Sequence, residues 1–85
     1  MELNETIKLM NSDDYQDRFK AEYKQLSIRV QGLERMLYMY DMDKLSFEPK
    51  CSRELLASQA LSMRTYQAIL EERARIENIQ LYQVD

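Results

Sequence analysis

The sequence of 85 residues has no histidine and no tryptophan, and it has only one cysteine, one glycine and one proline. Without histidine the chain lacks the commonest general base and the commonest metal ligand of proteins. A single glycine excludes a glycine-rich phosphate-binding loop, and a single cysteine excludes an intrachain disulfide. These absences predict a protein that is not an enzyme and that holds no metal and no cofactor.

Charge and hydropathy narrow the range of partners. Acidic residues outnumber basic ones by 15 to 12, so the formal net charge is −3. Binding to DNA needs a basic field, and we therefore expect no DNA partner. The sequence has no uninterrupted apolar run of the roughly 18 residues that a membrane-spanning helix needs, and it does not open on a charged and then apolar leader. We expect no membrane contact and no export.

One feature of the first half of the chain is strongly regular. Apolar residues recur there at alternating steps of four and three, which places them on one side of an α-helix as in a coiled coil. The ladder comprises Phe19, Tyr23, Leu26, Val30, Leu33, Leu37 and Tyr40. It predicts a first long helix over residues 13–42.

A second helical pattern follows the stretch that contains the only proline. Ser52 is a good N-cap, and Leu56, Met63 and Leu70 then recur at intervals of seven, with Tyr66 between the last two. We predict a second long helix that packs back on the first, so that the two form an antiparallel hairpin.

The whole chain is therefore predicted to be a single all-α domain over residues 1–85. Its expected parts are a short N-terminal helix within 1–11, the long helices at 13–42 and 52–79, a connection at 43–51 and a tail at 80–85. Phe47 is expected to fold inward from the connection. The alternating tail is compatible with a strand, a docked extension or a frayed end.

The chain carries more apolar surface than one hairpin can bury. Hydrophobic residues make up 45% of it, and small domains bury a low fraction of their surface. Because self-association is a common way to stabilise a small scaffold, we predict coiled-coil-like packing into a homo-oligomer. The predicted interface residues are Ile28, Met36, Met39, Ile69 and Ile76.

Two polar residues interrupt the heptad pattern of the second helix, Gln59 and Arg73. A polar side chain that faces a partner helix costs free energy unless it is paired. Arg73 either extends over apolar neighbours or anchors a carboxylate or phosphate. Arginine beside an aromatic ring suits nucleotides, but is commoner at protein interfaces. The predicted ligand-binding residues are Arg73, Tyr66, Arg64 and Gln59.

Several strings of this sequence are distinctive when they are taken together. They are DYQDRFKAEY at 14–23, LSFEPKC at 45–51, and the pattern from Leu55-Leu56 through Gln59 and Tyr66 to Ile76. Over roughly residues 12–81 the chain resembles a family of small helical-hairpin proteins from phages and prophages of gut and Gram-positive bacteria. These are the crAss-like-phage-related proteins, a family with no known function.

The resemblance implies a small phage accessory protein that acts in the cytoplasm of the bacterial host. Such proteins often inhibit bacterial immunity, and some of hairpin size are oligomeric sponges. The implied partners are further copies of the chain and a cyclic nucleotide or ADP-ribose-type immune signal, which a sponge sequesters without cleaving it. The alternative is a protein-binding helical module that inhibits a host defence complex or serves in phage assembly.

Overall fold

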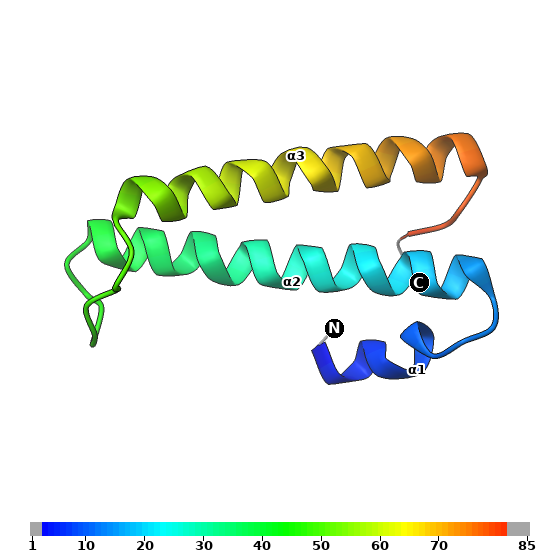
Figure 1. Ribbon diagram of the computed structural model, residues 1–85, viewed down its shortest axis with the longest axis horizontal. Helices are drawn as coiled ribbons and strands as arrows, with labels where there is room; N and C mark the ends of the chain where they lie inside the picture. The colour runs from blue at the N-terminus through cyan, green and yellow to red at the C-terminus, as the bar shows by residue number, and fades with distance from the viewer. Residues whose placement is uncertain (1–2, 82–85) are drawn as a thin grey trace.

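The computed structural model describes residues 3–81 and is built from helices. A 3-10 turn, η1 (Leu3–Thr6), leads into α1 (Ile7–Met10), and two long helices follow, α2 (Tyr15–Asp41) and α3 (Arg53–Glu77). The long helices lie antiparallel along each other, and η1 and α1 fold back beneath the first half of α2 (Figure 1). The predicted all-α class, with a short N-terminal helix and two long packed helices, is confirmed.

Short polar side chains fix where the long helices begin and end. The Asp14 carboxylate accepts the Gln16 N–H at 2.9 Å at the start of α2, and the Ser52 hydroxyl accepts the Leu55 N–H at 3.1 Å at the start of α3. Asn78, in the left-handed region (φ 60°), ends α3. The predicted Ser52 cap is therefore confirmed.

The ladder of α2 faces α3 along most of its length. Five of its members are buried, namely Phe19, Tyr23, Leu26, Val30 and Leu37. Leu33 is half-buried, whereas Tyr40 is 45% exposed, so the prediction is wrong at that end. A seven-residue repeat drifts by about 20° per heptad on a straight helix, and three heptads carry Tyr40 round toward solvent.

The side of α3 that faces α2 differs from the predicted one. Ala60, Gln67, Leu70 and Ala74 are buried and Met63 is half-buried, in alternating steps of three and four. Tyr66 is 42% exposed, and Gln59 and Arg73 are exposed as well. The prediction that Tyr66 faces α2 is therefore wrong, whereas Gln59 and Arg73 lie outside the packed face, as the alternative of an arginine that extends over apolar neighbours requires. A pattern of large apolar residues does not include the two alanines. Their small side chains leave room for the rings of α2.

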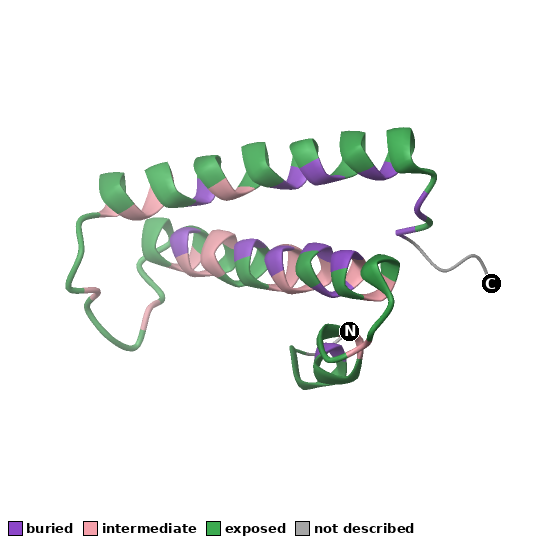
Figure 2. Ribbon diagram, turned by 45° about the vertical axis from the view of Figure 1, so that its right-hand side comes forward, coloured by how far each residue is buried: buried purple, intermediate pink, exposed green. Residues whose placement is uncertain are grey.

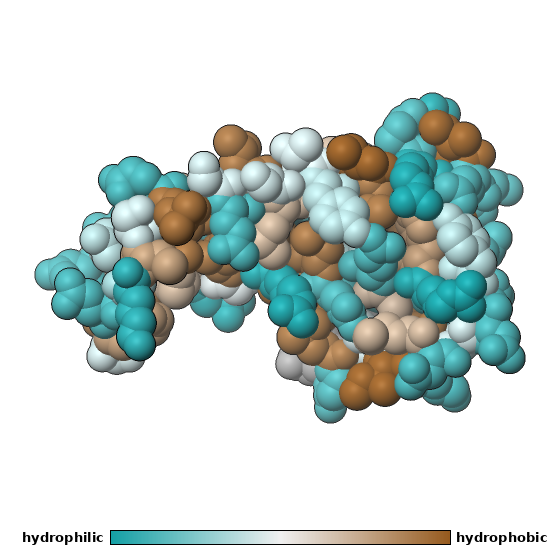
Figure 3. All heavy atoms as spheres, viewed as in Figure 1, coloured by the Kyte–Doolittle hydropathy of each residue, from teal (hydrophilic) through white to brown (hydrophobic). Residues whose placement is uncertain are grey.

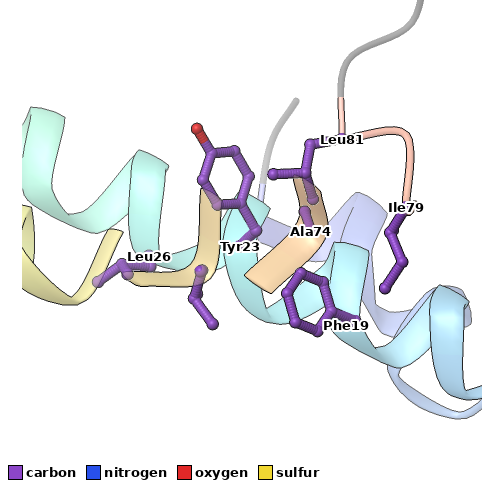
Figure 4. Close-up of a cluster of buried hydrophobic side chains, with 7 residues drawn as sticks. Phe19, Tyr23, Leu26, Ala74, Ile79 and Leu81 are labelled. Atoms are coloured by element: carbon purple, nitrogen blue, oxygen red, sulfur yellow. The ribbon is translucent and has the colours of Figure 1, made fainter. Parts of the chain in front are cut away.

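The main core lies at the open end of the hairpin. Phe19, Tyr23 and Leu26 of α2 meet Leu70 and Ala74 of α3, and Ile79 and Leu81 fold back over them from the segment that follows α3 (Figure 4). Figure 2 shows the buried positions of the long helices on their facing sides. Of the open alternatives for the tail, a docked extension describes residues 79–81, and residues 82–85 lie outside the described range.

At the other end of the hairpin, an ion pair holds the end of α2 and the start of α3 together across the connection. Arg53 donates two hydrogen bonds of 2.7 Å to the Asp41 carboxylate across it. Phe47 is 56% exposed, so the prediction that it folds inward is wrong. The ion pair draws the two helix ends together without the aromatic ring.

The N-terminal segment covers the side of α2 that faces away from α3. Thr6 and Ala21 are fully buried there, and the Gln25 amide donates a hydrogen bond of 2.9 Å to the Thr6 hydroxyl. Ile28 is half-buried on the same side of α2. Within residues 3–81, no helix has the length and apolarity needed to cross a bilayer.

Candidate functional site

Arg73 lies at the edge of the core, close to the open end of the hairpin. Its guanidinium is 5.0 Å from the centre of the Phe19 ring and donates a hydrogen bond of 2.9 Å to the Tyr15 hydroxyl. Tyr15 in turn donates to Glu77 at 2.9 Å, and Arg73 Nε lies 3.4 Å from a Glu77 oxygen. The arginine thus extends over an aromatic neighbour and already faces a carboxylate.

Arg64 has a different set of partners. It makes a two-pronged ion pair with Glu34, whose Oε2 accepts from Arg64 Nε at 2.9 Å, and it donates to the Gln67 amide oxygen at 2.6 Å. The buried Gln67 donates to the Ser27 hydroxyl at 2.8 Å. This polar network links α3 to α2 between the apolar contacts.

The two sets of contacts define two edges of the hairpin, which we call the Tyr15 flank and the Glu34 flank. Gln59 and Tyr66 are spaced by sevens from Arg73, so these three residues share the Tyr15 flank. Arg64 is turned about 160° from Tyr66 around α3 and lies on the Glu34 flank. The structure therefore brings three of the four predicted ligand-binding residues to one edge and Arg64 to the other.

Two open hollows are lined by described residues. One open hollow of about 560 Å³ is lined by the connection, including Tyr40 and Phe47, and another of about 300 Å³ lies between α3 and the segment at 79–81. Neither is lined by any of the four predicted ligand-binding residues. Within the described part of the chain, no three Cys, Asp or Glu residues are grouped so as to hold a metal ion.

The five predicted interface residues are distributed over more than one surface. Ile69 and Ile76 are 53% and 67% exposed and point away from α2, whereas Ile28, Met36 and Met39 are half-buried. Figure 3 shows hydrophobic residues along the upper edge of the molecule, over α3. Exposed apolar surface on α3 therefore exists, and whether a second copy covers it stays a prediction.

Sequence reasoning missed Gln67 as the polar residue between the helices. No buried side-chain nitrogen or oxygen within residues 3–81 lacks a hydrogen-bond partner, so Gln67 and Ser27 are satisfied by each other and their neighbours. The signal that could have found Gln67 is the step of three and four that joins Ala60, Met63 and Leu70 through it.

The Glu34–Arg64 pair should make stability depend on pH. The hydrogen bond from Arg64, aided by its charge, lowers the pKa of Glu34 from its ordinary value. A carboxyl whose pKa is lower in the folded state stabilises the fold above its unfolded pKa, and this contribution is lost as pH falls through the folded value.

We expect Glu34→Gln to lower the free energy of unfolding at pH 7 by no more than about 1 kcal/mol, because the pair is partly exposed. At pH 3 the difference between the variant and the wild type should be smaller than at pH 7, because the contribution is lost as pH falls toward the lowered pKa of Glu34. Thermal denaturation at both pH values measures this, with Glu22→Gln at an exposed site as the control. A difference that persists unchanged at pH 3 would contradict the role of the ionised carboxylate.

Comparisons with known proteins bear on most of the hairpin. A family model described as Sequestin matches residues 13–76. A relative in Enterobacteria phage T4, described as an uncharacterized 7.5 kDa protein of the denB-rIIB intergenic region, is 37% identical over 59 residues, which is 69% of this chain and 88% of the relative. No solved structure matches the chain. The similarity to a phage protein is thus confirmed, and membership of the crAss-like-phage-related family stays a prediction.

Proposed function

Because this chain belongs to the Sequestin family, we propose that it is a phage-encoded anti-defence protein that sequesters a nucleotide-derived immune signal in the cytoplasm of the bacterial host. The family match, which spans most of both long helices, is the observation that carries the proposal. Sequestration implies binding without turnover, and the absence of histidine from the sequence agrees with a protein that does not cleave its ligand.

The proposal includes a homo-oligomer. Two helices and a short third one leave large apolar side chains in solvent, among them Leu55, Ile69 and Ile76, each more than half exposed. A second copy that packs against them would remove this surface from water. The ligand would then bind at or beside the contact between copies, because Tyr66 and Arg73 lie next to the exposed isoleucines of α3.

On this view Arg73, Tyr66 and Gln59 contact the ligand from the Tyr15 flank, next to Ile69 and Ile76. Tyr66, at 42% exposure, offers a ring face for stacking on a base. Arg73 keeps 47% of its side chain exposed beside Glu77 and offers donors to a phosphate. Arg64, on the Glu34 flank, would contact the same ligand only if that ligand bridged two copies.

The direct test is to incubate the purified protein with a panel of cyclic oligonucleotides and ADP-ribose derivatives. Unbound compounds are removed by filtration, the protein is heat-denatured, and the released compounds are separated by chromatography. We expect one compound to be retained and released intact. Release of cleaved products would indicate an enzyme, and retention of none of the panel would overturn the nucleotide sponge.

Arg73→Met tests the proposed contact on the Tyr15 flank. We expect the variant to keep its helical content and assembly, while its affinity for the retained ligand falls roughly ten- to a hundredfold through loss of a charge-assisted hydrogen bond. Equilibrium dialysis measures the affinity and circular dichroism checks the fold. Arg75→Met is the matched control, because Arg75 is 70% exposed and pairs only with its helix neighbour Glu72. Unchanged affinity of Arg73→Met would remove this residue from the site.

The alternative is a helical module that binds a protein, either a host defence complex or a phage assembly partner. The exposed apolar residues of α3 favour it, because aromatic and apolar side chains form the centre of protein interfaces. A wild-type protein that retains none of the nucleotides but copurifies with one stoichiometric host protein during infection would support this alternative.

A further inference from the structure

The positive charges of this acidic protein are not equally available to a ligand. Four arginines each face a carboxylate within 4 Å, namely Arg53, Arg64, Arg73 and Arg75. The side chains of Lys20, Lys24 and Arg35 on α2 make no ion pair and no hydrogen bond within residues 3–81. Lys8 on α1 and Lys44 and Lys50 in the connection are also without an ion pair in this range, but α2 carries the largest group of unpaired cations, whereas the predicted ligand-binding arginines are on α3.

Lys20, Lys24 and Arg35 share one side of α2, whereas the unpaired Arg29 lies on another side. Steps of four, three, four, four and three connect six polar residues, which we call the basic stripe, and all six lie within roughly 80° around the helix axis. The basic stripe comprises Lys20, Lys24, Ser27, Gln31, Arg35 and Tyr38. It borders the Glu34 flank and is on the other side of the hairpin from Arg73.

No acidic residue interrupts the basic stripe. Asp17 lies one turn before it, and its carboxylate accepts a hydrogen bond of 2.8 Å from the Ser12 hydroxyl. Glu34 and Glu71 lie beside it on the Glu34 flank; the first is paired with Arg64, and the second accepts a hydrogen bond of 2.6 Å from the Tyr23 hydroxyl. The chain has a net charge of −3, yet positive charge is concentrated locally on this stripe.

The chemistry of the basic stripe suits a phosphate-bearing ligand. Lys20 and Lys24 are one turn apart, about 6 Å along the axis, which matches neighbouring phosphate groups. Both are half-buried, so their stems pack on the helix surface while the ammonium groups stay accessible. Gln31 adds a donor and an acceptor, and Tyr38, 62% exposed, adds a ring at the far end of the stripe.

We infer that the basic stripe is an anion-binding surface that holds the phosphate groups of the sequestered nucleotide. This inference rests on the proposed function for the chemical class of the ligand. The location of the binding surface is inferred from the unpaired cations of α2. Arg73 and the stripe lie on opposite sides of one hairpin, so one ligand would touch both only by bridging two copies.

The test is a titration of isotope-labelled protein with inorganic pyrophosphate, followed by amide chemical shifts. We expect the shifts to concentrate between residues 20 and 38 and to weaken with added salt. Lys20→Gln combined with Lys24→Gln keeps the length of both side chains and removes two charges. It should lower the affinity for pyrophosphate at least about tenfold. Arg29→Gln, an unpaired arginine on another side of α2, should change it less than about twofold.

Each outcome separates the inference from the function on which it rests. Shifts that spread evenly over the exposed lysines, or a Lys20→Gln, Lys24→Gln variant that binds pyrophosphate as the wild type does, would overturn the basic stripe. If pyrophosphate binds the stripe but the wild type retains no nucleotide, the stripe stands and the sponge fails. If a nucleotide is retained equally by the wild type and the double variant, the sponge stands and the stripe fails.

Discussion

Leu70→Ala is expected to lower the free energy of unfolding by about 2–5 kcal/mol, which is a large part of the stability of a domain this small. Leu70 is fully buried at the centre of the main core, where the rings of Phe19 and Tyr23 meet α3. Removing three carbon atoms there costs their burial and leaves a cavity beneath the rings of α2. Thermal and urea denaturation followed by circular dichroism measure the loss.

Leu61→Ala is the matched control, because the same atoms are removed from the same helix at a position that is 71% exposed. Its effect should stay within about 0.5 kcal/mol. If the two variants melted at the same temperature, the assignment of the helix face that packs against α2 would be wrong.

The fold could be predicted from the sequence because the apolar periodicity of α2 is formed by large side chains. Leucine, valine and aromatic residues at steps of four and three leave one choice of face, and polar N-caps mark where the helices begin. The single proline and its neighbours place the connection between the helices. These signals are local, and they were sufficient for the class and the order of the elements.

The packing face of α3 could not be found in the same way. Its buried positions include Ala60, Gln67 and Ala74, none of which scores as strongly apolar. Large neighbours such as Tyr66 and Ile69 are exposed instead, so a pattern built on large residues selects the wrong side of α3. The alanines are buried here because large side chains of α2 fill the space beside them. Such complementarity between two helices cannot be inferred from the sequence of either helix alone.

The candidate site was predicted less well than the fold, because the availability of a charged side chain to a ligand depends on whether another side chain already pairs with it. Arg64 and Arg73 stood out as arginines near a predicted seam, but their partners Glu34 and Tyr15 are distant in sequence. The lysines of the basic stripe were not among the predicted ligand-binding residues. Only the folded arrangement shows which cations are already compensated and which are free.

The exposed apolar side of α3 leads to the last expected result, on assembly. Tyr66, Ile69 and Ile76 lie within about 80° of one another around α3. Burying an isoleucine contributes about 1.5–3 kcal/mol, and in a twofold dimer each residue is buried twice. Because Ile69 and Ile76 are 53% and 67% exposed, the two per chain would supply at least about 3.6 kcal/mol to a symmetric contact, which corresponds to between about two and three orders of magnitude in the dissociation constant.

Replacing both residues, Ile69→Lys and Ile76→Lys, removes this contribution and places charges against the opposing copy. We expect the wild type to sediment as an oligomer at micromolar concentration and the double variant as a 10.3 kDa monomer with its helices retained. Ile7→Lys is the control, since Ile7 is 55% exposed, close to the 53% of Ile69, but lies on α1. It should leave the mass unchanged. A wild type that is already a monomer would refute the oligomer, and a double variant that remains assembled would move the contact to another surface of the hairpin.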